Sequence, residues 1–295
     1  SALLALQGGM EGGLAAAELL VGDGNPSGKT VDTFAKSLDD YPSTYNFHES
    51  RDYVDYTDDI YVGYRYFETI PGAAEKVVYP FGYGLSYTTF DVETVSAGVV
   101  NSNCTSEANK LYAKVRVTNT GKFSGKEVVQ VYIAKPQGKL GKPAKELAAF
   151  EKTRELQPGE SQLMILTWEI NDMASYDDLG KVKKSAYVLE AGSYDIYVGT
   201  SVRDVTKADY SYILNHDVIT EQLSAKLVPT SLPKRMLADG SYEALPQSEP
   251  VDTDYSAIGN IDPSLTEGVA PCQRAIPYFR FADGMAKNGS HDIMD

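Results

Sequence analysis

Acidic residues are the first candidates for chemistry in this sequence. Glu49, Asp55, Asp58 and Asp59 fall close together, and Glu11 lies in a glycine-rich stretch. Acid/base cleavage of a bond needs two carboxylates that face it from about 5–9 Å apart. Neighbouring aspartates in an extended segment point in opposite directions, so Asp58 and Asp59 do not meet this requirement. A solvated, charged loop is therefore the favoured interpretation, with Asp59 also placed to anchor backbone amides.

Two glycine-rich stretches come close to nucleotide-binding loops but fail on spacing. In residues 22–30 a phosphate-binding loop would need a glycine where Asp23 stands, and an aspartate repels phosphate. This stretch also follows a predicted helix instead of a strand. In residues 8–13, Met10 occupies a position at which the dinucleotide-binding pattern requires glycine. The sequence therefore predicts no nucleotide cofactor.

Histidine and cysteine spacing predicts no metal site. His48, His216 and His291 are scattered, and no paired ligand spacing occurs. Cys104 has no neighbouring histidine or motif that would activate it as a nucleophile. Cys104 and Cys272 are the only cysteines in 295 residues. This usage favours a reducing, cytoplasmic compartment over a disulfide framework, and we expect neither a metal ion nor another cofactor.

The charge balance disfavours two classes of partner. The chain has 27 lysines and arginines against 41 aspartates and glutamates, which gives a net charge of −14. Nucleic acids and anionic membranes both attract positive charge, so neither is an expected partner. No apolar run reaches the length of about 18 residues that a membrane-spanning helix needs.

One stretch, residues 56–90, is rich in aromatic residues. Ten lie within it: Tyr56, Tyr61, Tyr64, Tyr66, Phe67, Tyr79, Phe81, Tyr83, Tyr87 and Phe90. Gly82 and Gly84 permit tight turns between the rings, and Pro80 prevents a regular helix across the second half. So many rings cannot all face water, so we expect this segment, the aromatic clamp, to pack one domain on another. Arg65 is expected to be buried there and paired with a carboxylate, since an arginine can stack on rings while it binds an anion.

The region before the clamp has the pattern of an α/β unit. Residues 2–6 are a candidate buried strand, and residues 14–21 a helix that is apolar on most sides and expected to be buried. One strand and one helix cannot bury their own faces, so we expect partner strands elsewhere and a chain that starts within a domain. Residues 22–55 are predicted to be mainly loop, with a short edge strand at residues 31–34.

The region after the clamp alternates apolar and polar residues, as antiparallel strands do. Candidate strands are residues 111–117, 127–134, 146–156, 161–170 and 210–214, with residues 186–189 and 193–198 as a hairpin. This spacing predicts a β-sandwich of the immunoglobulin or fibronectin type III kind. Trp168, the only tryptophan, is expected to be at least partly buried because of its size. Residues 221–295 contain seven prolines and are expected to form an extended strap.

Three runs, in this order, resemble the pattern of glycoside hydrolase family 3, the β-glucosidase and β-xylosidase family. They are Asn-Pro-Ser-Gly-Lys at residues 25–29, Val-Gly-Tyr-Arg-Tyr-Phe at residues 62–67, and Pro-Phe-Gly-Tyr-Gly-Leu-Ser-Tyr-Thr-Thr-Phe at residues 80–90. The resemblance implies a mixed fold in three parts. These parts are the end of an α/β sandwich domain with the aromatic clamp (1–90), a fibronectin type III-like β-sandwich (91–220), and a linker (221–295) towards a missing barrel.

The resemblance also implies where the chemistry lies. The family's nucleophile is an aspartate on a (β/α)8 barrel, and its acid/base glutamate lies upstream of the segment that contains Glu11. No catalytic residue is then expected in this chain. The chain looks like an internal, scaffolding segment of a retaining β-glycosidase, most simply a β-glucosidase acting on terminal non-reducing β-linked sugars, in a rearranged branch with the barrel last.

Two alternatives to this interpretation stay open at the level of sequence. The clamp could contact a sugar directly instead of packing between domains, because aromatic faces suit the C–H surfaces of sugars. The chain could also be a non-catalytic carbohydrate-binding or adhesion module, or a purely structural domain. In the enzyme interpretation its partners are a β-linked oligosaccharide and the barrel of the same protein, and the segment alone is expected to be inactive.

Overall fold

The computed structural model describes residues 3–47, 54–100, 109–224 and 232–246. Within these limits the chain divides into two compact units, and each is described by itself. The first unit consists of Ser1–Lys36, Ile60–Lys226 and Ala238–Gly240, and the second of Ser37–Asp59, Leu227–Leu237 and Ser241–Asp295. The predicted domain boundaries at residues 90 and 220 stay a prediction, and most of the predicted strap lies outside the described residues.

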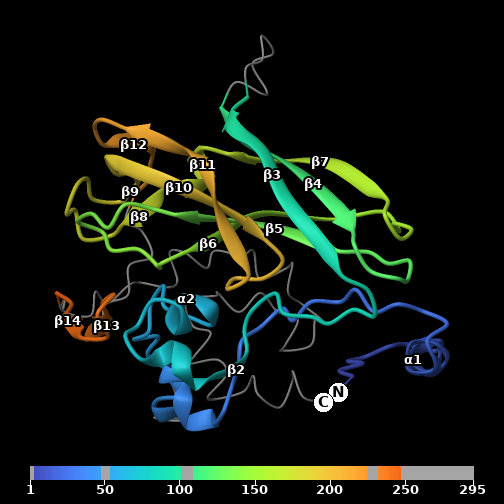
Figure 1. Ribbon diagram of the computed structural model, residues 1–295. Helices are drawn as coiled ribbons and strands as arrows, with labels where there is room; N and C mark the ends of the chain where they lie inside the picture. Colours follow the sequence, from blue (N-terminus) through green and yellow to red (C-terminus); the bar gives the residue numbers. More distant parts are fainter. Residues whose placement is uncertain (1–2, 48–53, 101–108, 225–231, 247–295) are drawn as a thin grey trace, which may run out of the picture. The chain divides into compact units, whose positions relative to one another are not determined.

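Two antiparallel sheets form a β-sandwich in the first unit (Figure 1). One sheet has the order β11-β10-β5-β6, with β5 at Val128–Ala134, β6 at Glu146–Lys152, β10 at Gly192–Gly199 and β11 at Val205–Leu214. The other has the order β3-β4-β7, with β3 at Phe90–Val99, β4 at Lys110–Asn119 and β7 at Ser161–Glu169. The predicted strands at 111–117, 127–134, 161–170 and 210–214 lie on these elements to within a residue, whereas the predicted strand at 146–156 extends four residues beyond β6. The predicted fold class is confirmed.

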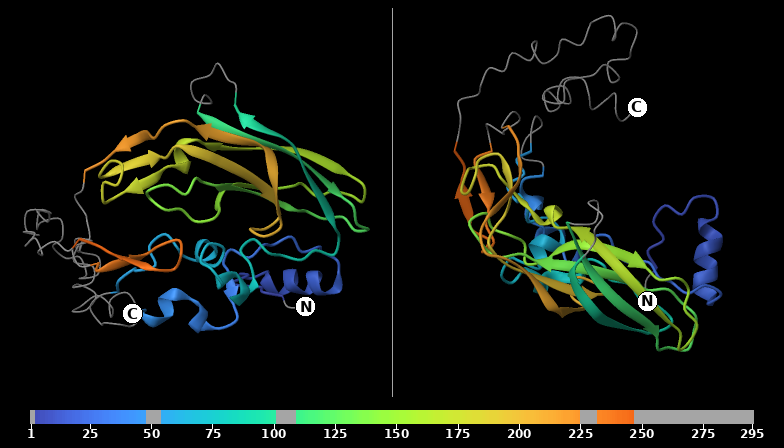
Figure 2. Two further views of the ribbon diagram at one scale, coloured as in Figure 1. Left: turned by 60° about the vertical axis from the view of Figure 1, so that its left-hand side comes forward. Right: turned by 90° about the horizontal axis from the view of Figure 1, so that it is seen from above.

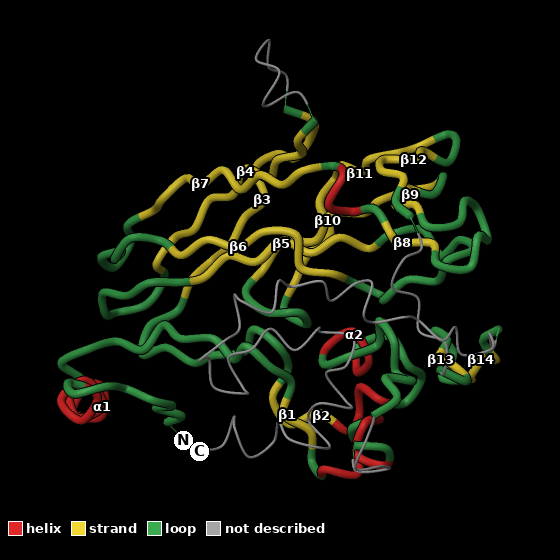
Figure 3. Tube along the Cα trace, turned by 180° about the vertical axis from the view of Figure 1, so that it is seen from behind, coloured by secondary structure: helices red, strands yellow, loops and turns green. Residues whose placement is uncertain are grey.

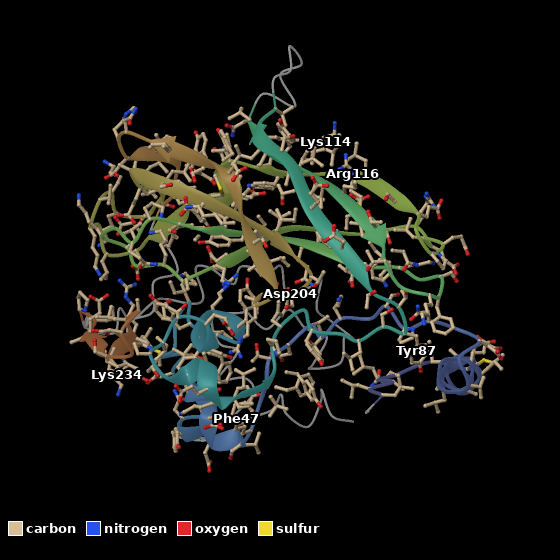
Figure 4. The ribbon with its side chains drawn as sticks, viewed as in Figure 1. Phe47, Tyr87, Lys114, Arg116, Asp204 and Lys234 are labelled. Carbon is tan, nitrogen blue, oxygen red and sulfur yellow. The ribbon has the colours of Figure 1, made fainter. Side chains whose placement is uncertain are left out.

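The core of the sandwich follows from alternation along each strand. On β4, the side chains of Leu111, Val115 and Val117 are fully buried, whereas Lys114 and Arg116 between them point away from the core (Figure 4). Residues of both sheets contribute to one apolar cluster, so the two inner faces pack against each other. Trp168 belongs to this cluster with only 5 % of its surface exposed, and its expected burial is therefore confirmed.

A third, small sheet of order β12-β9-β8 lies at one end of the sandwich (Figures 1 and 3). Its strands are β8 at Ser175–Asp177, β9 at Ala186–Leu189 and β12 at Val218–Gln222. The predicted hairpin of residues 186–189 and 193–198 is therefore wrong, because β9 pairs with β8 and β12 while β10 pairs with β5 and β11. The reason is Glu190 between them, whose buried side chain is bound by the β5–β6 loop, so the chain crosses between sheets instead of turning back.

The N-terminal elements differ from the expected buried α/β unit. Leu3 and Leu6 lie in exposed coil, so the described part of the predicted strand at residues 2–6 is no strand. Helix α1 spans Gly12–Val21 and ends at Gly22, whose φ of 87° gives a left-handed cap. None of its side chains is buried, since no described strand covers its apolar faces. The predicted burial of this helix is therefore wrong within the described chain. Figure 2 shows α1 from two further directions.

Short elements connect α1 to the sandwich. They are β1 at Phe34–Ala35, α2 at Tyr64–Phe67, the 3-10 turn η3 at Ala73–Lys76, and β2 at Val77–Tyr79. Strand β1 pairs with β2, which shifts the expected edge strand at residues 31–34 towards Phe34. The 3-10 turn η4 at Asn171–Met173 follows β7.

The described part of the second unit contains two 3-10 turns and one pair of strands. They are η1 at Leu38–Asp40, η2 at Pro42–Tyr45, β13 at Lys234–Met236 and β14 at Tyr242–Ala244. A capping box at Ser37 and Asp40 begins η1. Among the described helices of either unit, none has the length and apolar character of a membrane span.

Candidate functional site

The aromatic clamp meets the sandwich through Tyr64. Helix α2 places the Tyr64 ring 4.6 Å from that of Phe81 and 6.1 Å, edge to face, from that of Tyr132 on β5, measured between ring centroids. The hydroxyl oxygen of Tyr64 accepts a hydrogen bond from the backbone N–H of Leu147 on β6 (3.0 Å). Phe67, one helical turn further, is fully buried. Tyr64 and Phe67 are therefore packing groups, and the polar end of Tyr64 has a hydrogen-bond partner.

A buried amide, Gln130 on β5, links three segments. Its Nε2 donates to the carbonyl oxygens of Gly82 (3.3 Å) and Thr200 (2.8 Å), and its Oε1 accepts from the Tyr132 hydroxyl (2.5 Å). Burial raises the pKa of Tyr132, so this hydroxyl stays a donor. At Gly82, where φ is 80°, a β-carbon would come within 2.3 Å of the Gln130 side chain. A glycine is thus required for the clamp to approach the sheet this closely.

The run of residues 25–29 is bound to the clamp through Asn25. Its Nδ2 donates to the carbonyl oxygen of Ser124 (2.8 Å), and its Oδ1 accepts from the Ser86 hydroxyl (2.9 Å) and from the backbone N–H of Tyr87 (2.9 Å). The Tyr87 hydroxyl, labelled in Figure 4, donates to the carbonyl oxygen of Leu19 in α1 (2.7 Å). The clamp therefore connects α1, the 25–29 run and the β4–β5 loop.

Lys29, at the end of that run, forms an ion pair with Glu127 (Nζ to Oε1, 2.7 Å). Both side chains are nearly buried, so the lysine is engaged by a carboxylate instead of being presented to a phosphate. This geometry agrees with the absence of a phosphate-binding pattern in the sequence. Gly84 lies next to the same run, and a β-carbon there would be 2.1 Å from the Gly28 carbonyl oxygen.

Arg65 differs from its prediction. Its side chain is 43 % exposed, and its Nε lies 3.7 Å from Oε1 of Glu146, which a second cation, Lys135, binds more closely. The expected burial of Arg65 is therefore wrong. Tyr64 and Phe67, three residues apart, share the inner face of α2, so Arg65 between them is turned about 100° outward. The better-placed ion pair on this segment joins Glu68 to Arg203 (2.8 Å) in the β10–β11 turn.

The loop between β5 and β6 carries a deeply buried ion pair. Lys142 Nζ lies 2.5 Å from Oε2 of Glu190, with side-chain exposures of 2 % and 4 %. Glu190 also accepts a hydrogen bond from the backbone N–H of Lys139 (2.6 Å). Burial lowers the pKa of Lys142, and the bond to Glu190 opposes this effect. The same loop is bound to the clamp where the backbone N–H of Ala144 donates to the Thr69 hydroxyl (2.8 Å).

The acidic candidates from the sequence do not form one paired site. Glu11 is exposed at the start of α1, in the first unit. In the second unit Asp58 is buried, and burial raises its pKa. Asp59 is exposed, has a φ of 51°, and pairs with Arg235 (Oδ2 to Nη1, 3.8 Å). Asp55 is half-buried. Glu49 lies outside the described residues.

The metal-ligand candidates give no cluster. His216 is exposed in the turn between β11 and β12, whereas His48, His291, Cys104 and Cys272 lie outside the described residues. Across the part of the chain that the structure describes, no group of three or more potential metal ligands occurs. The expectation of no metal ion, cofactor or catalytic residue stays a prediction.

Several contact residues were not singled out from the sequence, and Gln130, Glu68, Arg203 and Glu190 are the main ones. Gln130 did carry a signal, since it interrupts the apolar run of β5, and a polar residue inside such a run must find partners if it is buried. The three charged residues carried none, because each finds its partner far along the chain.

Two family models match the chain. The Glycosyl hydrolase family 3 C-terminal domain matches residues 1–87, which include all but the last three residues of the clamp. The Fibronectin type III-like domain matches residues 127–202, which include β5, β6, β7 and β10.

Curated relatives extend this similarity over most of the chain. Beta-glucosidase A of Butyrivibrio fibrisolvens is 63 % identical over 266 residues, which are 88 % of this chain and 32 % of that protein. A beta-glucosidase of Ruminococcus albus is 44 % identical over 257 residues, with 86 % and 26 % covered. The chain therefore spans about a third or less of the length of these relatives.

Solved structures agree with the sequence comparison. A beta-glucosidase from Paenibacillus barengoltzii has a TM-score of 0.70 at 46 % identity, with 81 % of this chain and 27 % of that chain covered. Beta-glucosidase 3B from Thermotoga neapolitana, solved in complex with α-D-glucose, has a TM-score of 0.61 at 39 % identity, with 71 % and 27 % covered. The resemblance carried by the three runs is confirmed. The chain belongs to glycoside hydrolase family 3. It matches that family's C-terminal domain at residues 1–87 and the Fibronectin type III-like domain at residues 127–202.

Proposed function

We propose that the protein carrying this chain is a β-glucosidase. It would hydrolyse terminal non-reducing β-linked glucose with retention, through a covalent glycosyl-enzyme intermediate. The observation that carries the proposal is the 63 % identity over 266 residues with beta-glucosidase A of Butyrivibrio fibrisolvens. The two cysteines of the sequence are the basis for the cytoplasmic location that we propose with it.

Within this function, the described part of the chain acts as a scaffold. Side chains of the clamp, of the 25–29 run and of the sandwich engage one another. Tyr64 is bound by Leu147, Gln130 by Gly82 and Thr200, and Lys29 by Glu127. These contacts all lie within the chain, so the side chains hold geometry in this proposal and do not act on the substrate. We therefore place both catalytic carboxylates outside the described residues, with the nucleophile on a (β/α)8 barrel that follows this chain.

The test compares the full-length protein with chain 1–295 on an aryl-β-glucoside, and an aryl-α-glucoside serves as the control substrate. The full-length protein should release the aryl group only from the β-glucoside, and chain 1–295 should not turn over. No β-glucosidase activity in folded full-length protein would refute the proposal and favour a non-catalytic module.

Two substitutions test whether this chain supplies the acid or base. Glu11→Gln and Asp59→Asn in the full-length protein should leave kcat within about twofold, because neither carboxylate acts on the substrate in this proposal. A positioned acid or base contributes about 10²–10⁴-fold. A loss of that size in either variant, with the melting temperature unchanged, would place that residue in the active site.

A further inference from the structure

A pocket lies on the small sheet at the end of the sandwich. It has a volume of about 420 Å³ and is lined by Asn171, Asp172, Ala174, Tyr187, Thr220 and Glu221. These residues come from η4, the residue after it, β9 and β12, which Figure 3 shows at the same end of the sandwich. The volume falls within the range of about 300–1,000 Å³ that is typical of small-ligand sites.

Two tyrosine rings form the aromatic part of this site. Tyr187 on β9 lines the pocket and pairs in register with Tyr176 on β8, and their ring centroids are 5.3 Å apart. Both side chains are exposed, whereas their neighbours Asp177 and Ala186 are buried, so the two rings share the outward face of the sheet. An exposed pair of adjacent rings on a rigid sheet is a surface on which a flat apolar face can stack.

A β-bulge brings the polar groups to the same place. Glu221 pairs in register with Tyr187, and the register shifts between Ile219 and Glu221, which leaves Thr220 as the extra residue. Because of the bulge, Thr220 and Glu221 both reach the pocket. The row Tyr176, Tyr187 and Glu221 therefore runs across the three strands.

The polar side chains of the pocket are available to a ligand. Within the described part of the chain, the side chains of Asn171, Asp172 and Glu221 take part in no hydrogen bond or ion pair. The two carboxylates supply acceptors, and the Asn171 amide supplies both a donor and an acceptor. The Thr220 hydroxyl donates to the carbonyl oxygen of Tyr187 (3.3 Å), so it offers a ligand its lone pairs. This set suits a ligand that offers many hydroxyl groups.

The charge of the pocket narrows the class of ligand. Asp172 and Glu221 would repel an anion, and the whole chain carries a net charge of −14. A metal ion is not supported, since the described residues contain no group of three or more acidic, histidine or cysteine ligands. A neutral sugar combines hydroxyl groups for the polar side chains with C–H faces for the rings.

We propose that this pocket binds a neutral β-linked oligosaccharide, with one sugar stacked on Tyr187 and Tyr176 and its hydroxyl groups bound by Asp172, Glu221 and Asn171. The choice of a β-linked glucan as ligand rests on the proposed function. The role of the pocket is to hold the chain of a polymeric or oligomeric substrate, which is a binding activity separate from bond cleavage.

The test is affinity electrophoresis of the full-length protein in native gels that contain soluble mixed-linkage β-glucan. The wild type should be retarded by the polysaccharide. Tyr187→Ala and Tyr176→Ala should each weaken the apparent affinity about tenfold, which is the effect of losing one stacked ring. Phe150→Ala is the matched control, because Phe150 on β6 is 69 % exposed and lies outside the pocket, and it should be retarded like the wild type.

Glu221→Gln and Asp172→Asn keep the side-chain shape and test the polar contacts if a tyrosine variant fails to fold. Each should weaken retardation while kcat/KM on a small aryl-β-glucoside stays unchanged. Retardation that all four pocket variants retain, or wild type that is not retarded, would overturn the inference. If the full-length protein hydrolyses the aryl-β-glucoside but is not retarded by the β-glucan, the inferred binding site is refuted and the proposed function stands. If the β-glucan retards the wild type and Tyr187→Ala abolishes this retardation, but the protein hydrolyses no aryl-β-glucoside, the proposed function is refuted and the inferred binding site stands.

Discussion

Replacing Lys142 by alanine is expected to destabilise the protein far more than replacing Arg65. Lys142 and Glu190 are almost fully buried at 2.5 Å, whereas the Arg65 side chain is 43 % exposed and lies 3.7 Å from Glu146. Truncating one partner of a buried pair strands the other charge and costs about 3–5 kcal/mol. A solvated pair contributes about 0–1 kcal/mol. Comparing the two variants therefore shows whether the loss of stability depends on the burial of the ion pair or only on the removal of a charge.

These free energies translate into melting temperatures. For a folded unit of this size, 1 kcal/mol shifts the melting temperature by about 2–4 °C. Lys142→Ala should therefore lower it by about 6–20 °C, and Arg65→Ala by less than about 4 °C. Differential scanning calorimetry of both variants at pH 7 measures this difference, and circular dichroism checks that each variant is folded at the start.

A double variant tests whether the stranded charge is the cause. Lys142→Met combined with Glu190→Gln leaves no buried charge, so it should recover at least half of the loss seen in Lys142→Ala. The amide can still accept the hydrogen bond that Lys139 N–H donates to Glu190. A Lys142→Ala shift no larger than that of Arg65→Ala would refute this reasoning. So would a double variant as unstable as Lys142→Ala.

Two further predictions concern the sandwich. Trp168→Ala should lower the free energy of unfolding by about 3–5 kcal/mol. Trp168→Phe should lower it clearly less, because the buried indole N–H that it removes has no hydrogen-bond partner in the described chain. Urea titrations of both variants measure the two free energies of unfolding. At Asp177, burial acts to raise the pKa, but four backbone N–H groups of residues 180–183 outweigh it and hold the pKa below its ordinary value. This group therefore stabilises the fold above the unfolded pKa of about 4 and loses its effect as pH falls through the lower folded value. The stability gap between wild type and Asp177→Asn should accordingly shrink between pH 5 and pH 2, and a constant gap would contradict the assignment.

The sequence was informative where burial is a local property. Alternation located the strands of the sandwich, and ring size placed Trp168 in the core. It was not informative where the outcome depends on distant segments. The strands at residues 186–189 and 193–198 had a convincing turn between them, yet the loop at residues 139–142 binds Glu190 and sends them to different sheets.

Helix α1 and Arg65 are two positions at which the sequence predicted burial and the structure shows exposure. The composition of α1 indicated burial, but burial needs a covering element, and no described strand supplies one. Arg65 lay among rings in sequence, yet helical geometry turned it away from the rings that surround it in the chain. In the candidate site, aromatic density predicted that the clamp would pack. The partners Gln130, Glu190 and Arg203 required the fold, since their contacts span 48 to 135 residues.

The position of the strand that binds the clamp determines how the clamp should detach during unfolding. Gln130 and Tyr132, which contact Gly82 and Tyr64, both lie on β5, and β5 is paired on both sides, with β6 and β10. A central strand opens only when its sheet comes apart, whereas an edge strand can fray by itself. The clamp is thus fastened to a protected part of the sandwich, and releasing it removes the Gly82 carbonyl oxygen as an acceptor for Gln130, which keeps its bonds to Thr200 and Tyr132. The backbone N–H of Gly82 donates to the carbonyl oxygen of Thr30 (2.8 Å), and that of Val202 donates to the carbonyl oxygen of Phe81 (3.1 Å). Because both bonds hold the clamp in place, these two amides should exchange with solvent in the same cooperative step as those of β5.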